Sequence, residues 1–120
     1  MEPMLMMRTA CILLAITALG GLTMAGMRFA GKPQPPTWLA MVHGLLAGAA
    51  VTLLLYAYFT VGIPSIAAWA LLLFLIAAAG GAFINLNYHW KQVALPIGLI
   101  VGHAAIAIVG FILLVVAVWR

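Results

Sequence analysis

The chain has 120 residues, of which 68% are hydrophobic and 5% are charged, and its mean hydropathy is +1.31. Soluble globular domains carry about a quarter charged residues, so this composition excludes that class, and a single Cys excludes an intramolecular disulfide framework. One acidic residue, Glu2, excludes sites built from paired carboxylates, and a net charge of +4 from five Lys and Arg residues is too sparse for a nucleic-acid-binding surface.

Four apolar stretches are each long enough to cross a bilayer, which takes roughly 20 helical residues. We predict spans at about 8–28, 38–60, 66–87 and 97–119. Turn-forming or polar segments separate them, namely GKPQPPT at 31–37, VGIPS at 61–65 and YHWKQVALP at 88–96. We therefore expect an all-α, integral-membrane four-helix bundle that forms a single transmembrane domain over residues 1–120. A signal peptide is the alternative interpretation of the first span, because Arg8 precedes an apolar run that ends in small residues.

Short loops predict an up-down-up-down arrangement, because consecutive helices joined by few residues run antiparallel. One side of the membrane then holds Arg28, Lys32 and Lys91, and the other holds Arg8 and Arg120. This balance favours termini outside the cytoplasm, although basic residues that serve a bound anion would not report on topology. We expect the bacterial inner (plasma) membrane as the location.

Rare residue types recur 60 residues apart along the chain. The coincidences include Gly20-Gly21 with Gly80-Gly81, Pro36 with Pro96 and His43 with His103. The spacing Pro-x6-His thus occurs twice in a chain with six Pro and three His. We predict two tandem two-helix repeats, residues 1–60 and 61–120. Because each repeat has an even number of spans, the repeats are parallel and related by a pseudo-twofold axis along the membrane normal.

This symmetry places His43 and His103 at matching depth on the second and fourth spans, about 10 Å below the surface at 1.5 Å per residue. Those spans are diagonal neighbours in the bundle, roughly 13 Å apart. Imidazoles that reach inward along this diagonal leave room for one metal in a flat macrocycle. We predict that His43 and His103 are the axial ligands of one haem b. The alternative is a pair of hydrogen-bonded packing histidines.

Glycines lie level with the two histidines, where a porphyrin would approach the helix backbone. The predicted contacts are Gly20, Gly21, Gly80, Gly81, Gly44 and Gly102. Close helix packing is the other reading of these glycines. The haem propionates would face the 31–37 and 88–96 loops, where the candidate partners are Arg28, Lys32, Lys91 and His89. The simpler interpretation of the three cations is that they anchor the interface. His89 has no repeat partner, and the simpler interpretation is that it is a surface residue in the loop.

The two histidines and the glycine pairs resemble the core of membrane b-type cytochromes, such as the cytochrome b561-type and quinol-oxidising cytochrome b proteins. The resemblance implies a four-helix bundle whose haem is held by His on two helices and touched by glycines on the others. Those families usually hold two haems, with two ligands on each ligand helix. Here each ligand helix has one His, so the resemblance does not extend to a second haem.

Two axial His ligands favour electron transfer over the binding of a substrate at iron. The leading hypothesis is therefore a small membrane cytochrome b that moves single electrons, either as an electron-transfer protein or as a quinol-linked oxidoreductase. Its partner would be a quinone or a redox protein at the face with the 31–37 and 88–96 loops, and the chain would act alone or in a homo- or hetero-oligomer. Two alternatives stay open: an anchor or assembly subunit of a larger redox complex, and a small His-dependent transporter.

Overall fold

The computed structural model describes residues 2–119, which form four long helices and one short π-helical segment. The elements are α1 (Pro3–Phe29), α2 (Thr37–Thr60), α3 (Ser65–Ile84), η1 (Asn85–His89) and α4 (Ile97–Trp119). All four spans, with α3 and η1 as one, are long and apolar enough to cross a membrane. The predictions of an all-α fold and of four helices long and apolar enough to cross a membrane are confirmed. Met1 and Arg120, the latter assigned above to one membrane side, lie outside the described residues.

Two helix boundaries differ from the sequence-based prediction. The first helix begins at Pro3, because the Glu2 carboxylate caps it by accepting a 2.7 Å hydrogen bond from the Leu5 amide. The extra N-terminal turn buries Met6 and Met7. At the other difference, α3 continues directly into η1, so that His89 belongs to a helical segment and not to the loop that was predicted there.

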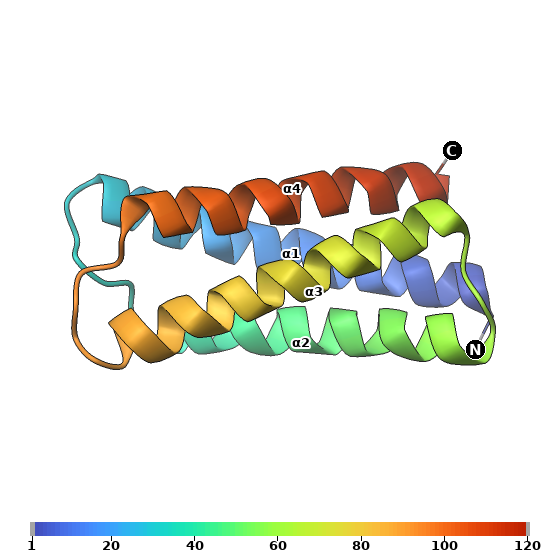
Figure 1. The fold of residues 1–120 in the computed structure, drawn as a ribbon, viewed down its shortest axis with the longest axis horizontal. Helices are drawn as coiled ribbons and strands as arrows, with labels where there is room; N and C mark the ends of the chain where they lie inside the picture. Colours follow the sequence, from blue (N-terminus) through green and yellow to red (C-terminus); the bar gives the residue numbers. More distant parts are fainter. Residues whose placement is uncertain (1, 120) are drawn as a thin grey trace.

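The helices run lengthwise in a bundle that measures 43 × 21 × 19 Å (Figure 1). Both termini and the turn between α2 and α3 lie at one end, here called the turn end. The 30–36 and 90–96 connections lie at the other, here called the loop end. Packing is close between α1 and α2 and between α3 and α4, and sparser between α2 and α3 and between α1 and α4. The α1–α3 and α2–α4 pairs are therefore the diagonals.

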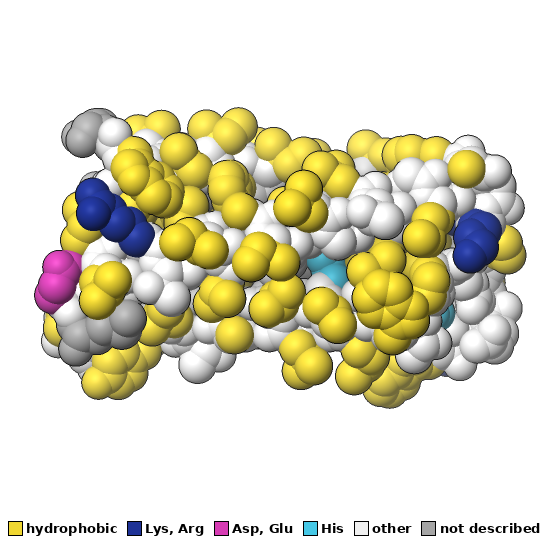
Figure 2. Space-filling view, turned by 180° about the vertical axis from the view of Figure 1, so that it is seen from behind, with side chains coloured by type: hydrophobic (Ala, Val, Ile, Leu, Met, Phe, Trp, Pro, Cys, Tyr) yellow, Lys and Arg dark blue, Asp and Glu magenta, His cyan; other side chains and the backbone are white. Residues whose placement is uncertain are grey.

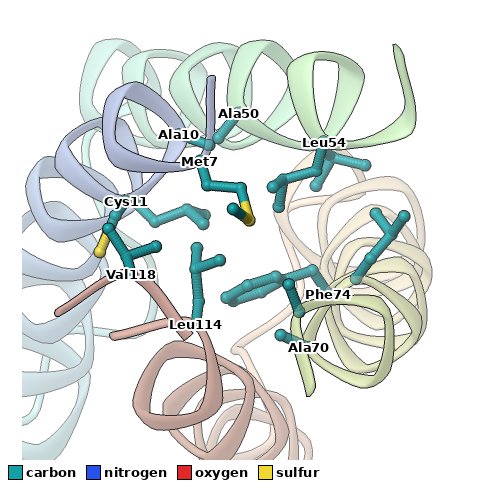
Figure 3. Packing of buried hydrophobic residues seen from close by; sticks show 13 residues of the cluster. Met7, Ala10, Cys11, Ala50, Leu54, Ala70, Phe74, Leu114 and Val118 are labelled. Carbon is teal, nitrogen blue, oxygen red and sulfur yellow. The ribbon is translucent and has the colours of Figure 1, made fainter. Parts of the chain in front are cut away.

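The closely packed core occupies the turn end only. Figure 3 shows side chains from all four helices meeting there, among them Met7, Leu54, Phe74 and Leu114. Buried positions of the first helix pair recur 60 residues later in the second pair: Ala10 and Ala70, Cys11 and Leu71, Leu14 and Phe74, Ala50 and Gly110, Leu54 and Leu114. In α4 the buried residues are Gly110, Leu114 and Val118, so its half nearer the loop end contributes none.

Hydrogen bonds tie the two connections together at the loop end. Arg28 Nε donates to the Leu95 carbonyl oxygen at 2.8 Å, and the Leu95 amide donates to the Pro33 carbonyl oxygen at 3.1 Å. The side chain of Gln34 donates to the Val93 carbonyl oxygen at 3.1 Å. We call this set of contacts the loop clasp. It links segments more than 50 residues apart and holds the α1–α2 pair to the α3–α4 pair.

The outer surface is rich in exposed apolar side chains, and the face drawn in Figure 2 is apolar along the length of the bundle. Large side chains such as Leu19, Leu45, Phe59 and Ile112 are exposed there. The few charged residues gather at the two ends. Trp38, Trp69, Trp90 and Trp119 are also exposed. A surface of this kind suits the hydrocarbon of a bilayer, with aromatic residues toward its boundaries.

Candidate functional site

His43 and His103 hold equivalent places in α2 and α4. Each lies six residues after the first residue of its helix, Thr37 in α2 and Ile97 in α4. His43 Nδ1 lies 2.8 Å from the carbonyl oxygen of Thr17 in α1. His103 Nδ1 lies 2.7 Å from the carbonyl oxygen of Ala77 in α3. Both imidazoles therefore bind the backbone of the helix that packs against their own.

Glycine makes each of these contacts feasible. On an α-helix a side chain covers the turn that precedes it, so residue i+4 shields the carbonyl of residue i. Gly21 and Gly81 stand at that position relative to Thr17 and Ala77. A Cβ atom on Gly21 would lie 2.8 Å from His43 Cε1, and one on Gly81 would lie 3.0 Å from the same atom of His103. The bare backbone thus admits the ring.

The hydrogen bonds decide which ring nitrogen carries a proton. A carbonyl oxygen only accepts, so Nδ1 of His43 and of His103 must be the donor. In each neutral ring Nε2 then presents a lone pair, and neither Nε2 has a hydrogen-bond partner among residues 2–119. A histidine whose Nδ1–H is held by a carbonyl while Nε2 is free has the form that ligates metals.

The two rings approach each other across the centre of the bundle. Their centroids lie 6.2 Å apart and their planes are inclined by 68°. A metal–imidazole bond is roughly 2.0 Å and a ring centre lies about 1.1 Å behind its nitrogen, so a metal held by both rings needs centroids about 6 Å apart. The observed centroid separation of 6.2 Å equals the distance expected for two rings that hold one metal from opposite sides. Within residues 2–119 no group of three or more His, Cys, Asp or Glu side chains converges on a common point.

A cavity of about 380 Å³ adjoins the histidine pair and extends toward the loop end. Its wall contains His43, His103, Gly21, Gly81 and Gly44. A second hollow, of about 280 Å³, lies between α3 and α4, and Gly80, Gly102 and His103 line it. Figure 2 shows histidine surface between apolar side chains midway along the bundle. The half of the bundle that lacks a packed core is thus the half that contains the cavity.

The glycines differ in what surrounds them. A Cβ atom on Gly20 or Gly80 would be in ordinary contact with the neighbouring imidazole, at 3.9 and 3.8 Å. A Cβ atom on Gly44 or Gly102 would meet nothing within 4 Å. The structure thus places Gly20, Gly21, Gly80 and Gly81 beside the imidazoles. Contact of any of the six with a porphyrin remains a prediction.

His89 lies inside the molecule and not on its surface, so the surface interpretation is wrong. It is 5% exposed, it lines the cavity, and its Nδ1 lies 3.2 Å from Asn85 Oδ1. Each turn of a π-helix holds an extra residue, which rotates the following side chains around the helix axis. In η1 this turns His89 inward, whereas Trp90 is exposed. Sequence reasoning missed Asn85, which no motif distinguishes from a surface amide.

Of the three basic candidates, one makes a hydrogen bond within the protein and two are exposed. The half-buried Arg28 donates to the Leu95 carbonyl oxygen as part of the loop clasp. Lys32 and Lys91 are exposed in the two connections. All three therefore lie at the loop end, at the same end of the bundle as His89.

Comparisons with protein-family models, with curated proteins and with solved structures found no match.

Proposed function

We propose that this chain is a small integral-membrane cytochrome b, in which His43 and His103 hold one haem b and the protein transfers single electrons. One observation carries the proposal. Two imidazoles, each held through Nδ1 by a backbone carbonyl and without a hydrogen-bond partner at Nε2 among residues 2–119, line one cavity with ring centroids 6.2 Å apart. Two histidines complete the coordination of a metal when a macrocycle supplies the remaining donors.

The donor set and its surroundings fit a haem. Imidazole Nε2 is a common axial ligand, and its affinity rises when Nδ1–H is held by a carbonyl. The cavity wall is apolar around the histidines, with small residues such as Gly44, Ala47 and Gly48. Three cationic side chains lie at the loop end, where Arg28, Lys32 and Lys91 would pair with propionates. A haem has the same distribution of polarity, because its ring is apolar and its two anionic propionates lie on one edge.

The haem supplies one-electron exchange when bound, and the residues of the chain set its conditions. His43 and His103 would both ligate the haem iron, which would disfavour binding of a substrate there. The carbonyls of Thr17 and Ala77 fix the ring orientations. A site near the loop end favours exchange with a quinone or a redox protein at that face. His89 is the residue that would accept a proton from a quinol there.

We also propose the finer architecture. The chain is one transmembrane domain over residues 1–120, an up-down-up-down bundle of two tandem repeats, 1–60 and 61–120. The matching pairs of buried positions support the repeat, as do the equivalent contacts of His43 and His103. We place it in the bacterial inner membrane, alone or in a homo- or hetero-oligomer.

The test is the spectrum of the purified protein after expression with ample haem supply. We expect a Soret band, sharp α and β bands on reduction, and one haem per chain by pyridine haemochrome. A low-spin signal in electron paramagnetic resonance should report two axial imidazoles. A colourless protein that is folded by circular dichroism would overturn the proposal.

A further inference from the structure

The cavity beside the histidine pair is not enclosed equally on all sides. Every lining residue that is exposed on the outer surface comes from α2 or α3: Met41, Gly44, Leu45, Gly48, Ala78 and Ala82. The lining residues of α1 and α4, such as Met24 and His103, are half-buried. The cavity therefore opens sideways, between α2 and α3.

The loop end of the cavity is closed. Pro35, Leu95 and His89 line that end, and each is buried. The loop clasp holds two of the segments involved, because Leu95 accepts from Arg28 and donates to Pro33. A solute that approaches the loop end from the aqueous phase therefore meets closed packing and does not reach the cavity from that side.

Side-chain size explains the lateral opening. Gly44 and Gly48 on α2 and Ala78 and Ala82 on α3 leave the edges of the gap without bulk. A Cβ atom on Gly48 would meet nothing within 4 Å. The residues of α2 in the hydrophobic core, Ala50, Val51 and Leu54, lie further toward the turn end. The thin stretch of the cavity wall thus lies beside the histidines, at a depth where a bilayer would place hydrocarbon.

We propose that this gap between α2 and α3 is a lateral portal through which haem reaches His43 and His103 from the bilayer. The identity of the molecule that passes, haem, rests on the proposed function. The existence of the opening rests on the exposure of the cavity wall. A flat apolar ring partitions into lipid and can pass small side chains. Its anionic groups would stay near the membrane surface, toward Arg28 and Lys91.

The first experiment measures haem uptake by apoprotein in vesicles whose bilayer contains haemin. The portal variant is Gly48→Leu with Ala78→Leu. Its matched control is Ala49→Leu with Ala79→Leu, since both of these positions are exposed, adjacent in sequence and absent from the cavity wall. We expect the portal variant to develop its Soret band roughly tenfold more slowly, because a bulky side chain raises the barrier to entry. The control should match the wild type. Equal rates in all three proteins would overturn the portal.

The second experiment needs no haem. Met24→Cys, in a Cys11→Ala background, places a thiol on the cavity wall of α1. A lipid-soluble maleimide should label it, a charged membrane-impermeant maleimide should not, and the portal substitutions should slow the first reaction roughly tenfold. Equal labelling by both reagents, or labelling unaffected by the portal substitutions, would contradict lateral entry. If the protein binds no haem but labels as expected, the proposed function fails and the portal stands.

Discussion

His43 in α2 donates a 2.8 Å hydrogen bond through Nδ1 to the carbonyl oxygen of Thr17 in α1, which is reachable because Gly21 has no side chain. The bond fixes the tautomer and the ring orientation without any metal. His103 and Ala77 repeat the relationship in α4 and α3. Two imidazole rings are therefore held in fixed orientations by the chain itself, and a ligand that binds them does not have to order them.

Replacement of either inner histidine should remove the haem. We expect His43→Ala and His103→Ala each to lose the Soret band, or retain only a weak remnant, because one axial ligand is absent and the site is not otherwise built to hold the iron. His89→Ala is the matched control, since His89 lines the same cavity away from the ring pair. It should keep the spectrum. Full colour in both single variants would remove the axial assignment.

Addition of one methyl group at Gly21 or Gly81 should displace the neighbouring imidazole, His43 or His103, without replacing it. A Cβ atom on Gly21 would lie 2.8 Å from His43 Cε1, so the ring must move and its hydrogen bond to Thr17 must lengthen. Overpacking of this kind typically costs about 1–3 kcal/mol. We expect Gly21→Ala and Gly81→Ala to weaken haem binding by tenfold or more, since roughly 1.4 kcal/mol is a factor of ten, measured by haemin titration and by shifted low-spin resonance signals.

The control for this prediction is Gly26→Ala, because a Cβ atom there would meet nothing within 4 Å. Like Gly21→Ala, it replaces a helix-destabilising glycine of α1 by alanine. The comparison therefore separates steric effects on the imidazole from changes in helix stability. Binding by Gly21→Ala that equals both the wild type and Gly26→Ala would show that the imidazole does not need the bare backbone.

Most of the fold followed from the sequence because each span is an uninterrupted apolar run bounded by turn residues. The predicted 38–60 and 97–119 spans agree with α2 and α4 to within one residue. The matching positions of the two histidines within their helices could also be predicted, since each lies seven residues after a Pro that precedes the helix. The recurrence at 60 residues led to these positions without any structural information.

Other features depend on tertiary contacts that no local pattern encodes. The acceptors of the imidazole protons are backbone carbonyls, at Thr17 and Ala77, and any residue type supplies a carbonyl. The π-helical turn that buries His89 has no sequence signature of its own. For this reason the sequence predicts a surface position for His89, whereas His89 is buried and lines the cavity.

Loss of the Arg28 side chain should loosen the loop clasp. Arg28 Nε donates a 2.8 Å hydrogen bond to the Leu95 carbonyl oxygen, and hydrogen bonds from charged groups contribute about 1.5–3 kcal/mol when shielded from water. Because Arg28 is only half-buried, we expect Arg28→Met to lower the free energy of unfolding by about 1 kcal/mol. Denaturant titration in mixed micelles measures the change. Lys32→Met, at an exposed position on the same connection, should have little effect.

Truncation of Leu54 and of Leu114 should have matching consequences if the chain is built from two equivalent halves. Both side chains are completely buried, 60 residues apart, in the core at the turn end (Figure 3). Lipid is as apolar as leucine, so the loss is mainly of packing and not of transfer from water, and the cavity that remains costs about 1–3 kcal/mol. We therefore expect Leu54→Ala and Leu114→Ala to lower the free energy of unfolding by similar amounts. Both should leave the haem spectrum unchanged, because the histidine pair lies in the other half of the bundle.

The exposed Leu45→Ala serves as a control for general effects on helix α2. A large destabilisation by one truncation and none by the other would show that the two halves of the core are not equivalent, whatever the symmetry of the histidines.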